Sequence, residues 1–177
     1  MPGREDLLVR EETETDRDAV HALTRDAFAG SELGHNGEAD LVDTLREVCD
    51  DGLALVAELD GELVGHILFT PVAIGDGVAV GMGLAPMSVA PSCQGQGVGS
   101  ILVRRGLEIL EGRGVPFVVV LGHGDYYPRF GFERASAHGV FCEFEGVPDE
   151  LFLIRVFDAA RTPEGTAFYH RAFHGVT

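Results

Sequence analysis

The sequence predicts an α+β fold in which helices flank a mixed, mostly antiparallel central sheet. Apolar, strand-like runs at Leu53 to Leu59 and Leu63 to Val72 flank Asp60-Gly61, a dipeptide typical of a tight hairpin turn. A helical pattern then separates the next strand from the apolar run Val115 to Leu121, which indicates a crossover within the sheet. The 177 residues, 45% of them hydrophobic, predict a single domain over 1–177.

The elements before the hairpin are predicted to be one strand and two helices. Leu7 to Glu11 has a strand pattern. Apolar residues three and four apart predict one helix around Val20 to Phe28 and another over Glu38 to Val48. The glycine-rich and polar run Gly30 to Gly37 between them is typical of a loop.

Beyond the crossover the patterns are shorter. Asp125 to Phe130 indicates a short helix, and Val140 to Glu145 and Leu151 to Val156 indicate two final strands. From Arg161 onward the apolar residues show no helical or strand periodicity.

A glycine-rich loop is the centre of the sequence. Leu84 to Val89 is a strand end, Pro91 stops the strand because it has no N–H to donate, and a helical pattern follows Gly99. The first turn of a helix has amides without internal partners and a partial positive charge. Since Gly95, Gly97 and Gly99 have no side chains, an anion can approach the backbone closely. The loop therefore predicts phosphate or pyrophosphate binding.

Two common phosphate motifs do not fit this loop. A nucleoside-triphosphate loop needs a lysine before the Ser/Thr that follows its last glycine, and Ser100 has none before it. A dinucleotide fold needs G-x-G-x-x-G and an acid after the next strand, but that strand is followed by Gly122-His123. A nucleotide-binding oxidoreductase is thus disfavoured.

Two motifs resemble the GNAT superfamily of N-acetyltransferases. Gln94-x-x-Gly97-x-Gly99 is similar to the acyl-CoA loop of that family, and Tyr127-x-x-x-Gly131-Phe132 is similar to the signature after its fifth strand. The resemblance covers residues 6–134 well and 135–177 loosely, and is nearest to a bacterial branch of uncharacterised, predicted N-acetyltransferases. It implies a GNAT-like acyl-CoA N-acyltransferase fold and acetyl-CoA as co-substrate.

The resemblance also implies where acetyl-CoA is held. Backbone groups of Met87 and Val89 would hold the pantetheine arm, and an N–H there would polarise the thioester carbonyl. The pyrophosphate would be held by the amides of Gln94, Gly95, Gln96, Gly97, Val98, Gly99 and Ser100.

The resemblance places Tyr127 as the general acid that protonates the leaving CoA thiolate, a role that suits a phenol that is neutral at pH 7. The alternative is an aromatic side chain that only packs. Many relatives use a glutamate on the central strand as base, but Ala79 to Val89 contains no carboxylate. His123 is the candidate base, since imidazole titrates near neutral pH; it could instead cap the helix or bond the loop.

The net charge and the cysteines indicate which classes of partner are disfavoured and which cellular compartment fits. The net charge of −16 argues against nucleic acid and anionic membranes. Cys49, Cys93 and Cys142 lack a C-x-x-C spacing, so neither a disulfide framework nor a metal site is expected, and a reducing cytoplasm fits.

The predicted function is transfer of an acetyl group to the primary amine of a small molecule or peptide. Direct attack in a ternary complex suffices because the thioester is already activated. The polar and acidic candidates for the acceptor pocket hint at a cationic amine, and they are Glu32, His35, Asn36, Glu143 and Glu145. The alternative is a non-catalytic domain of the same fold that senses acyl-CoA. The sequence does not determine the oligomeric state, and a homodimer is compatible with it.

Overall fold

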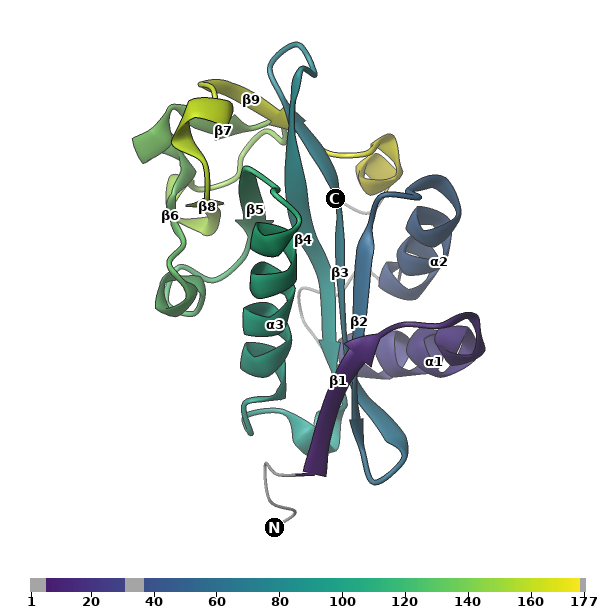
Figure 1. The fold of residues 1–177 in the computed structure, drawn as a ribbon. Coiled ribbons are helices and arrows are strands. Elements are labelled where there is room, and N and C mark those ends of the chain that lie inside the picture. The colour runs from purple at the N-terminus through teal and green to yellow at the C-terminus, as the bar shows by residue number, and fades with distance from the viewer. Residues whose placement is uncertain (1–5, 31–36, 176–177) are drawn as a thin grey trace. The chain divides into compact units, whose positions relative to one another are not determined.

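The computed structural model describes residues 6–30 and 37–175. Within these ranges it has an α+β fold with helices α1 (Arg17–Phe28), α2 (Glu38–Val48) and α3 (Val98–Gly112) (Figure 1). The strands are β1 (Leu7–Glu11), β2 (Leu53–Leu59), β3 (Glu62–Ile74), β4 (Ala79–Val89), β5 (Phe117–Leu121), β6 (Glu133–Arg134), β7 (Val140–Cys142), β8 (Phe152–Val156) and β9 (Gly165–Phe168). Antiparallel pairs predominate, and β4–β5 and β7–β9 are parallel. The predicted fold class is confirmed.

The chain divides into two compact units. The first comprises Met1–Leu68 and Pro86–Gly106, and the second comprises Phe69–Ala85 and Leu107–Gly175. Strands β3 and β4 and helix α3 each run through both units. The single domain over 1–177 stays a prediction.

In the first unit, β1 pairs antiparallel with β2 from Leu7↔Leu59 to Glu11↔Leu55, and α1 packs beside α2 (Figure 1). The β2–β3 turn is as predicted, because Asp60 and Gly61 have φ of 52° and 83°, the left-handed pair of a type I′ turn. A close approach explains Gly65 on β3. A Cβ there would lie 2.8 Å from Cγ1 of Val98, at the start of α3. The glycine therefore lets the helix start lie directly on the strand.

A charged cluster is buried in the same unit. The side chains of Glu12 and Arg46 are 6% and 13% exposed and form an ion pair, and His66 Nε2, fully buried on β3, lies 3.5 Å from Glu12 Oε2. Burial raises the pKa of Glu12, but the contacts with His66 and Arg46 outweigh it and hold that pKa below its usual value. The cluster ties the end of β1 to α2 and β3.

In the second unit, β5 is the central strand. It pairs parallel with β4 at Met82↔Val118 to Leu84↔Val120 and antiparallel with β8 along its full length. It begins at Phe117 rather than Val115, because Pro116 has no N–H for a strand ladder. The carbonyl of Pro116 instead accepts from the amides of Phe157 and Asp158.

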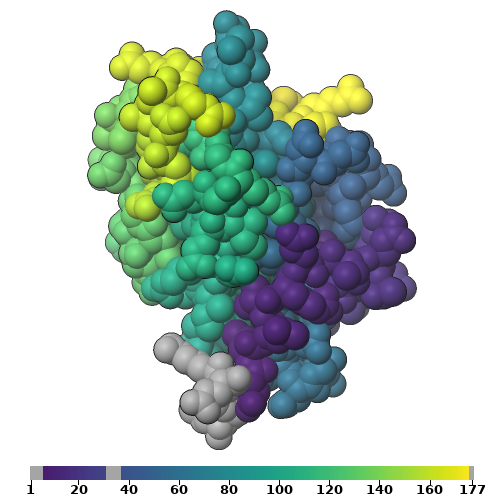
Figure 2. All heavy atoms as spheres, in the orientation of Figure 1, coloured from purple at the N-terminus to yellow at the C-terminus, as the bar shows by residue number. Residues whose placement is uncertain are grey.

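The segment after β8 forms a strand that the sequence did not reveal. Strand β9 pairs antiparallel with β3 at Ala73↔Phe168 and Ile74↔Ala167, and parallel with β7. In the space-filling view this yellow segment lies against the β3–β4 hairpin (Figure 2). The predicted strand Val140 to Glu145 ends at Cys142, and the predicted helix from Asp125 is a short 3-10 helix, Tyr127–Phe130.

Candidate functional site

The glycine-rich loop lies between a 3-10 helix, Pro91–Cys93, and α3. Gly95 and Gly97 have φ of 73° and 89°, which favours glycine. Two glutamine side chains fix the loop from within: Gln94 Nε2 donates to the Val89 carbonyl at 3.1 Å, and Gln96 Nε2 donates to the Ser92 carbonyl at 3.0 Å. The loop is thus held in shape by its own side chains, and its backbone remains available for a ligand.

The start of α3 has the geometry of an anion site. The amide of Ile101 donates to the carbonyl of Gly97 at 3.1 Å. The amides of Val98 and Gly99 come before this bond and have no helical carbonyl to reach, and Ser100 lies in the same first turn. A Cβ at Gly95 would meet nothing within 4 Å, so the loop backbone is open there. Amides and helix dipole together suit a pyrophosphate.

Met87 and Val89 lie near the end of β4 and are half-buried. The last residue of β4 that pairs with β5 is Leu84, so the strand continues five residues beyond that ladder, to Val89. The Val89 carbonyl is engaged by Gln94, and the next amide, that of Ala90, donates to the Val64 carbonyl at 2.8 Å. The implied pantetheine contacts of Met87 and Val89 stay a prediction.

Tyr127 is held in place by its neighbours. It begins a 3-10 helix, is 7% exposed, and packs edge-on against Tyr126 and Phe132 at ring-centroid distances of 5.0 and 5.6 Å. Its ring lies against Gly122, where a Cβ would come within 2.2 Å of Cε2. Burial, and to a lesser degree the charge of Tyr126, raise the pKa of Tyr127. The phenol is therefore protonated at neutral pH and able to donate a proton.

His123 is the second residue after β5 and takes part in placing Tyr127. Its carbonyl accepts from the amides of Tyr126 and Tyr127 at 3.1 and 3.4 Å, while His123 itself is exposed. The structure therefore brings the two predicted catalytic residues to the same end of β5, through a turn that begins at His123. Whether the imidazole acts as base stays a prediction.

Of the five residues predicted to line the acceptor pocket, the structure describes only Glu143 and Glu145. Glu32, His35 and Asn36 lie outside the described residues. Glu143 is 12% exposed; its Oε1 accepts from the Tyr169 amide at 2.7 Å, and its Oε2 lies 3.2 Å from His174 Nε2. Glu143 thus already holds the C-terminal segment, whereas Glu145 is exposed.

Sequence reasoning missed Tyr169, which follows β9. It is 8% exposed, and its hydroxyl has no hydrogen-bond partner among the described residues. Its ring lies against Gly83 of β4, where a Cβ would approach Cε1 to 2.8 Å. The only sequence signal would have been the cluster of aromatic residues in a tail without a period.

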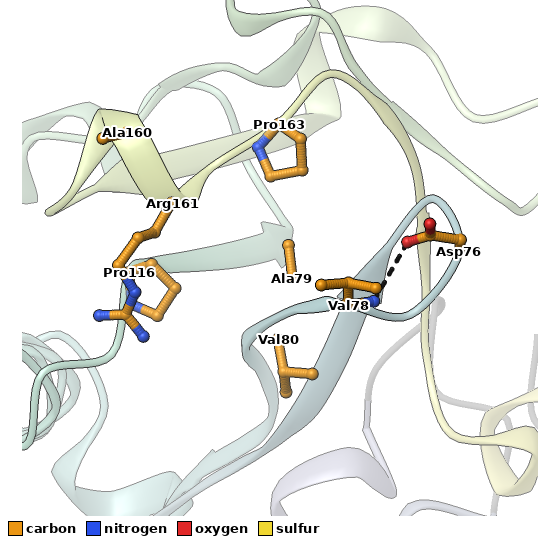
Figure 3. A pocket seen from close by; sticks show the side chains of 8 residues that line it. All are labelled: Asp76, Val78, Ala79, Val80, Pro116, Ala160, Arg161 and Pro163. Carbon is orange, nitrogen blue, oxygen red and sulfur yellow. Dashed lines mark hydrogen bonds between the residues drawn. The ribbon is translucent and has the colours of Figure 1, made fainter.

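A hollow of about 460 Å³ lies beside the β3–β4 hairpin, among residues of the second unit. Its lining is mostly apolar, and the side chains in Figure 3 are those of Asp76, Val78, Ala79, Val80, Pro116, Ala160, Arg161 and Pro163. The two charged side chains at its rim have other bonds: Asp76 Oδ1 accepts from the Val78 amide, and Arg161 donates to the Gly114 carbonyl. The hollow contains none of the predicted site residues.

Among the described ranges, one group has the spacing of metal ligands: His21, Asp40 and Asp43, with ligand atoms within 4.8 Å of one another. Asp43 Oδ2 lies 2.7 Å from His21 Nδ1 and Asp43 Oδ1 lies 2.8 Å from Arg46 Nη1, so ion pairs explain how His21 and Asp43 are placed, and Asp40 is exposed. The expectation of no metal stays a prediction. In the part of the chain that the structure describes, no helix has the length and apolar character needed to cross a membrane.

Three comparisons with known proteins indicate the same family. Residues 8–135 match the model of the acetyltransferase (GNAT) domain. The uncharacterized N-acetyltransferase YhbS of Escherichia coli K12 is 35% identical over 170 residues, covering 95% of this chain and 99% of the relative. The crystal structure of Escherichia coli YhbS in complex with CoA has a TM-score of 0.85 at 34% identity, covering 96% of this chain and 92% of that one. A GNAT family acetyltransferase from Brucella melitensis in complex with acetyl-CoA has a TM-score of 0.81 at 36% identity, covering 94% and 97%.

Proposed function

Because the chain belongs to the GNAT family of acetyltransferases, we propose that it transfers an acetyl group from acetyl-CoA to a primary amine. The amine attacks the thioester directly in a ternary complex, without a covalent enzyme intermediate. The acceptor is a small molecule or a peptide. The acetyl-CoA and CoA bound to the two similar crystal structures support the choice of donor.

The observation that carries this proposal is the placement of Tyr127. A residue that only filled space could be any aromatic, but this phenol follows the central strand of the second unit and is held on three sides by Gly122, Tyr126 and Phe132. Its raised pKa keeps the phenol protonated at neutral pH, so that Tyr127 holds a proton that it can give to the departing thiolate.

The remaining residues supply binding and proton transfer. The amides from Gln94 to Ser100 hold the pyrophosphate, and the backbone at Met87 and Val89 holds the pantetheine arm and polarises the thioester carbonyl. His123 takes a proton from the amine as its nitrogen attacks the carbonyl carbon. The C–N bond forms, the C–S bond breaks with its electron pair on sulfur, and Tyr127 gives its proton to that sulfur.

The test is the Tyr127→Phe variant, which removes only the hydroxyl. Calorimetry measures acetyl-CoA and CoA affinity, and release of the CoA thiol is followed over a panel of amines. We expect unchanged affinity and a fall in turnover of about 100-fold, within the usual range for loss of a general acid. Tyr126→Phe is the matched control and should keep wild-type turnover.

Equal turnover of the Tyr127→Phe and wild-type proteins would contradict the acid role. Binding of acetyl-CoA with no turnover on any amine would favour the alternative, a domain of the same fold that senses acyl-CoA.

A further inference from the structure

The tip of the β3–β4 hairpin exposes apolar side chains beside a hollow. Within residues 6–30 and 37–175, Val78 is the most exposed large hydrophobic side chain, at 85%, and Val80 is 47% exposed. Both line the hollow of about 460 Å³, across from Ala160 and Pro163 (Figure 3). An apolar projection and an apolar hollow therefore lie side by side on the second unit.

Pro116 explains why the hollow is open. The parallel ladder between β4 and β5 begins at Met82↔Val118. Two positions earlier the same register would pair Val80 with Pro116, which has no N–H to donate. The ladder therefore stops short of the start of β4, and Pro116 lines the hollow there. An open strand edge flanked by exposed apolar side chains is typical of a protein–protein contact.

The turn that carries Val78 is held in shape. Gly75 and Gly77 have φ of 69° and 87°, and Asp76 Oδ1 between them accepts from the Val78 amide at 3.2 Å. The projection is thus preorganised, so that docking it against a partner costs little conformational entropy.

The charges at the rim of the hollow are opposite in sign. The exposed side chain of Asp76 lies at one side of the hollow and that of Arg161 at the other (Figure 3). Arg161 Nη1 donates to the Gly114 carbonyl at 2.8 Å and lies 4.0 Å from Asp158 Oδ2, at the limit of an ion pair. In a chain of net charge −16, most of the surface repels a second copy. A rim with one acid and one base is a place where such a copy can approach.

We propose that the hollow is the contact between two copies of this chain, related by a two-fold axis. Such a contact uses the same patch on both copies, and this patch holds a projection, a hollow and both signs of charge. Val78 of one copy enters the hollow of its partner, and Asp76 of one copy faces Arg161 of the other. Burial of the apolar side chains drives association, and the charges fix its orientation. The inference does not depend on the proposed function, since the hollow contains none of the predicted site residues.

The test is sedimentation velocity of the full chain over a series of concentrations, which measures the dimer Kd. The wild-type protein should dimerise. Val78→Asp should raise the Kd by about 100-fold or more, because it brings carboxylates into the apolar contact. Val48→Asp is the matched control, since it makes the same exchange at a side chain that is 51% exposed and lies outside the hollow. That control should keep the wild-type Kd.

Charge reversal tests the orientation of the two copies. Asp76→Arg alone and Arg161→Asp alone each place like charges against one another, and each should raise the Kd by about 100-fold. The double variant restores opposite charges and should return the Kd to within about tenfold of the wild type. Thermal unfolding checks the fold of each variant, because Asp76→Arg also removes the bond to the Val78 amide.

A wild-type protein that stays monomeric at its highest soluble concentration would overturn the proposal. So would a dimer that persists in Val78→Asp, or one that Val48→Asp weakens as much. A double reversal that unfolds at the wild-type Tm but does not dimerise would also overturn it. Dissociation in Val78→Asp and in each single reversal, with recovery in the double variant, would establish the contact.

Discussion

Replacing Gly122 by alanine tests whether the position of the Tyr127 ring determines the rate. The new Cβ would lie 2.2 Å from Cε2 and 2.8 Å from Cδ2 of that ring, whereas ordinary contact begins near 3.4 Å. The ring must therefore retreat by about 1.2 Å, in a cluster where Tyr126 and Phe132 already occupy its edges.

Two effects follow from that displacement. Overpacking of this kind costs about 1–3 kcal/mol of unfolding free energy, which for a chain of this size is a Tm lower by roughly 2–4 °C for each kcal/mol. A catalytic group displaced by an ångström can lose about 100-fold in rate. We therefore expect a modestly destabilised protein with about 100-fold lower turnover and unchanged affinity for CoA.

Thermal unfolding, calorimetry with CoA and thiol release measure the three quantities. Gly112→Ala is the matched control: its Cβ would meet nothing within 4 Å, and alanine in a helix is favoured over glycine by about 0.5–1 kcal/mol. That control should be slightly more stable and fully active. A Gly122→Ala protein with wild-type turnover would refute the reasoning, whatever its Tm.

Three further substitutions test the loop, the buried cluster and the base. Gly97→Ala places a residue with a side chain in a left-handed backbone conformation, φ 89°, which raises the conformational energy of the loop by about 1–2 kcal/mol. Calorimetry should therefore give weaker CoA binding, with Gly30→Ala, where a Cβ meets nothing, as control. Glu12→Gln should lower the unfolding free energy by about 3 kcal/mol at pH 7 because Arg46 loses a buried partner. Because the folded pKa of Glu12 is lowered, this stabilisation is complete above the unfolded carboxyl pKa of about 4.3 and is lost as the pH falls through the folded pKa. Urea titrations that give the same difference at all pH values would contradict it. His123→Ala should flatten the neutral limb of the pH–rate profile, and an unchanged profile would exclude His123 as base.

The sequence by itself determined the turns and loops whose conformation depends on neighbouring residues. Asp60-Gly61 has one low-energy way to turn between two strands, and the structure has that turn. The same holds for the glycine-rich loop, since the left-handed backbone at Gly95 and Gly97 and the helix that starts at Val98 depend on neighbouring residues alone. The predicted order of strand, loop and helix is therefore confirmed, whereas anion binding by this loop stays a prediction.

The tertiary structure decided what depends on distant partners. Strand β9 has too few residues for a period, and it exists because its backbone pairs with β3, more than ninety positions earlier, and with β7. The burial of His66 beside Glu12, and the confinement of Tyr169 on Gly83, likewise result from packing between segments that no local pattern connects. A missing hydrogen bond is visible only once the neighbours of a side chain are in place, and so only the folded chain could reveal that the Tyr169 hydroxyl has no partner within residues 6–30 and 37–175.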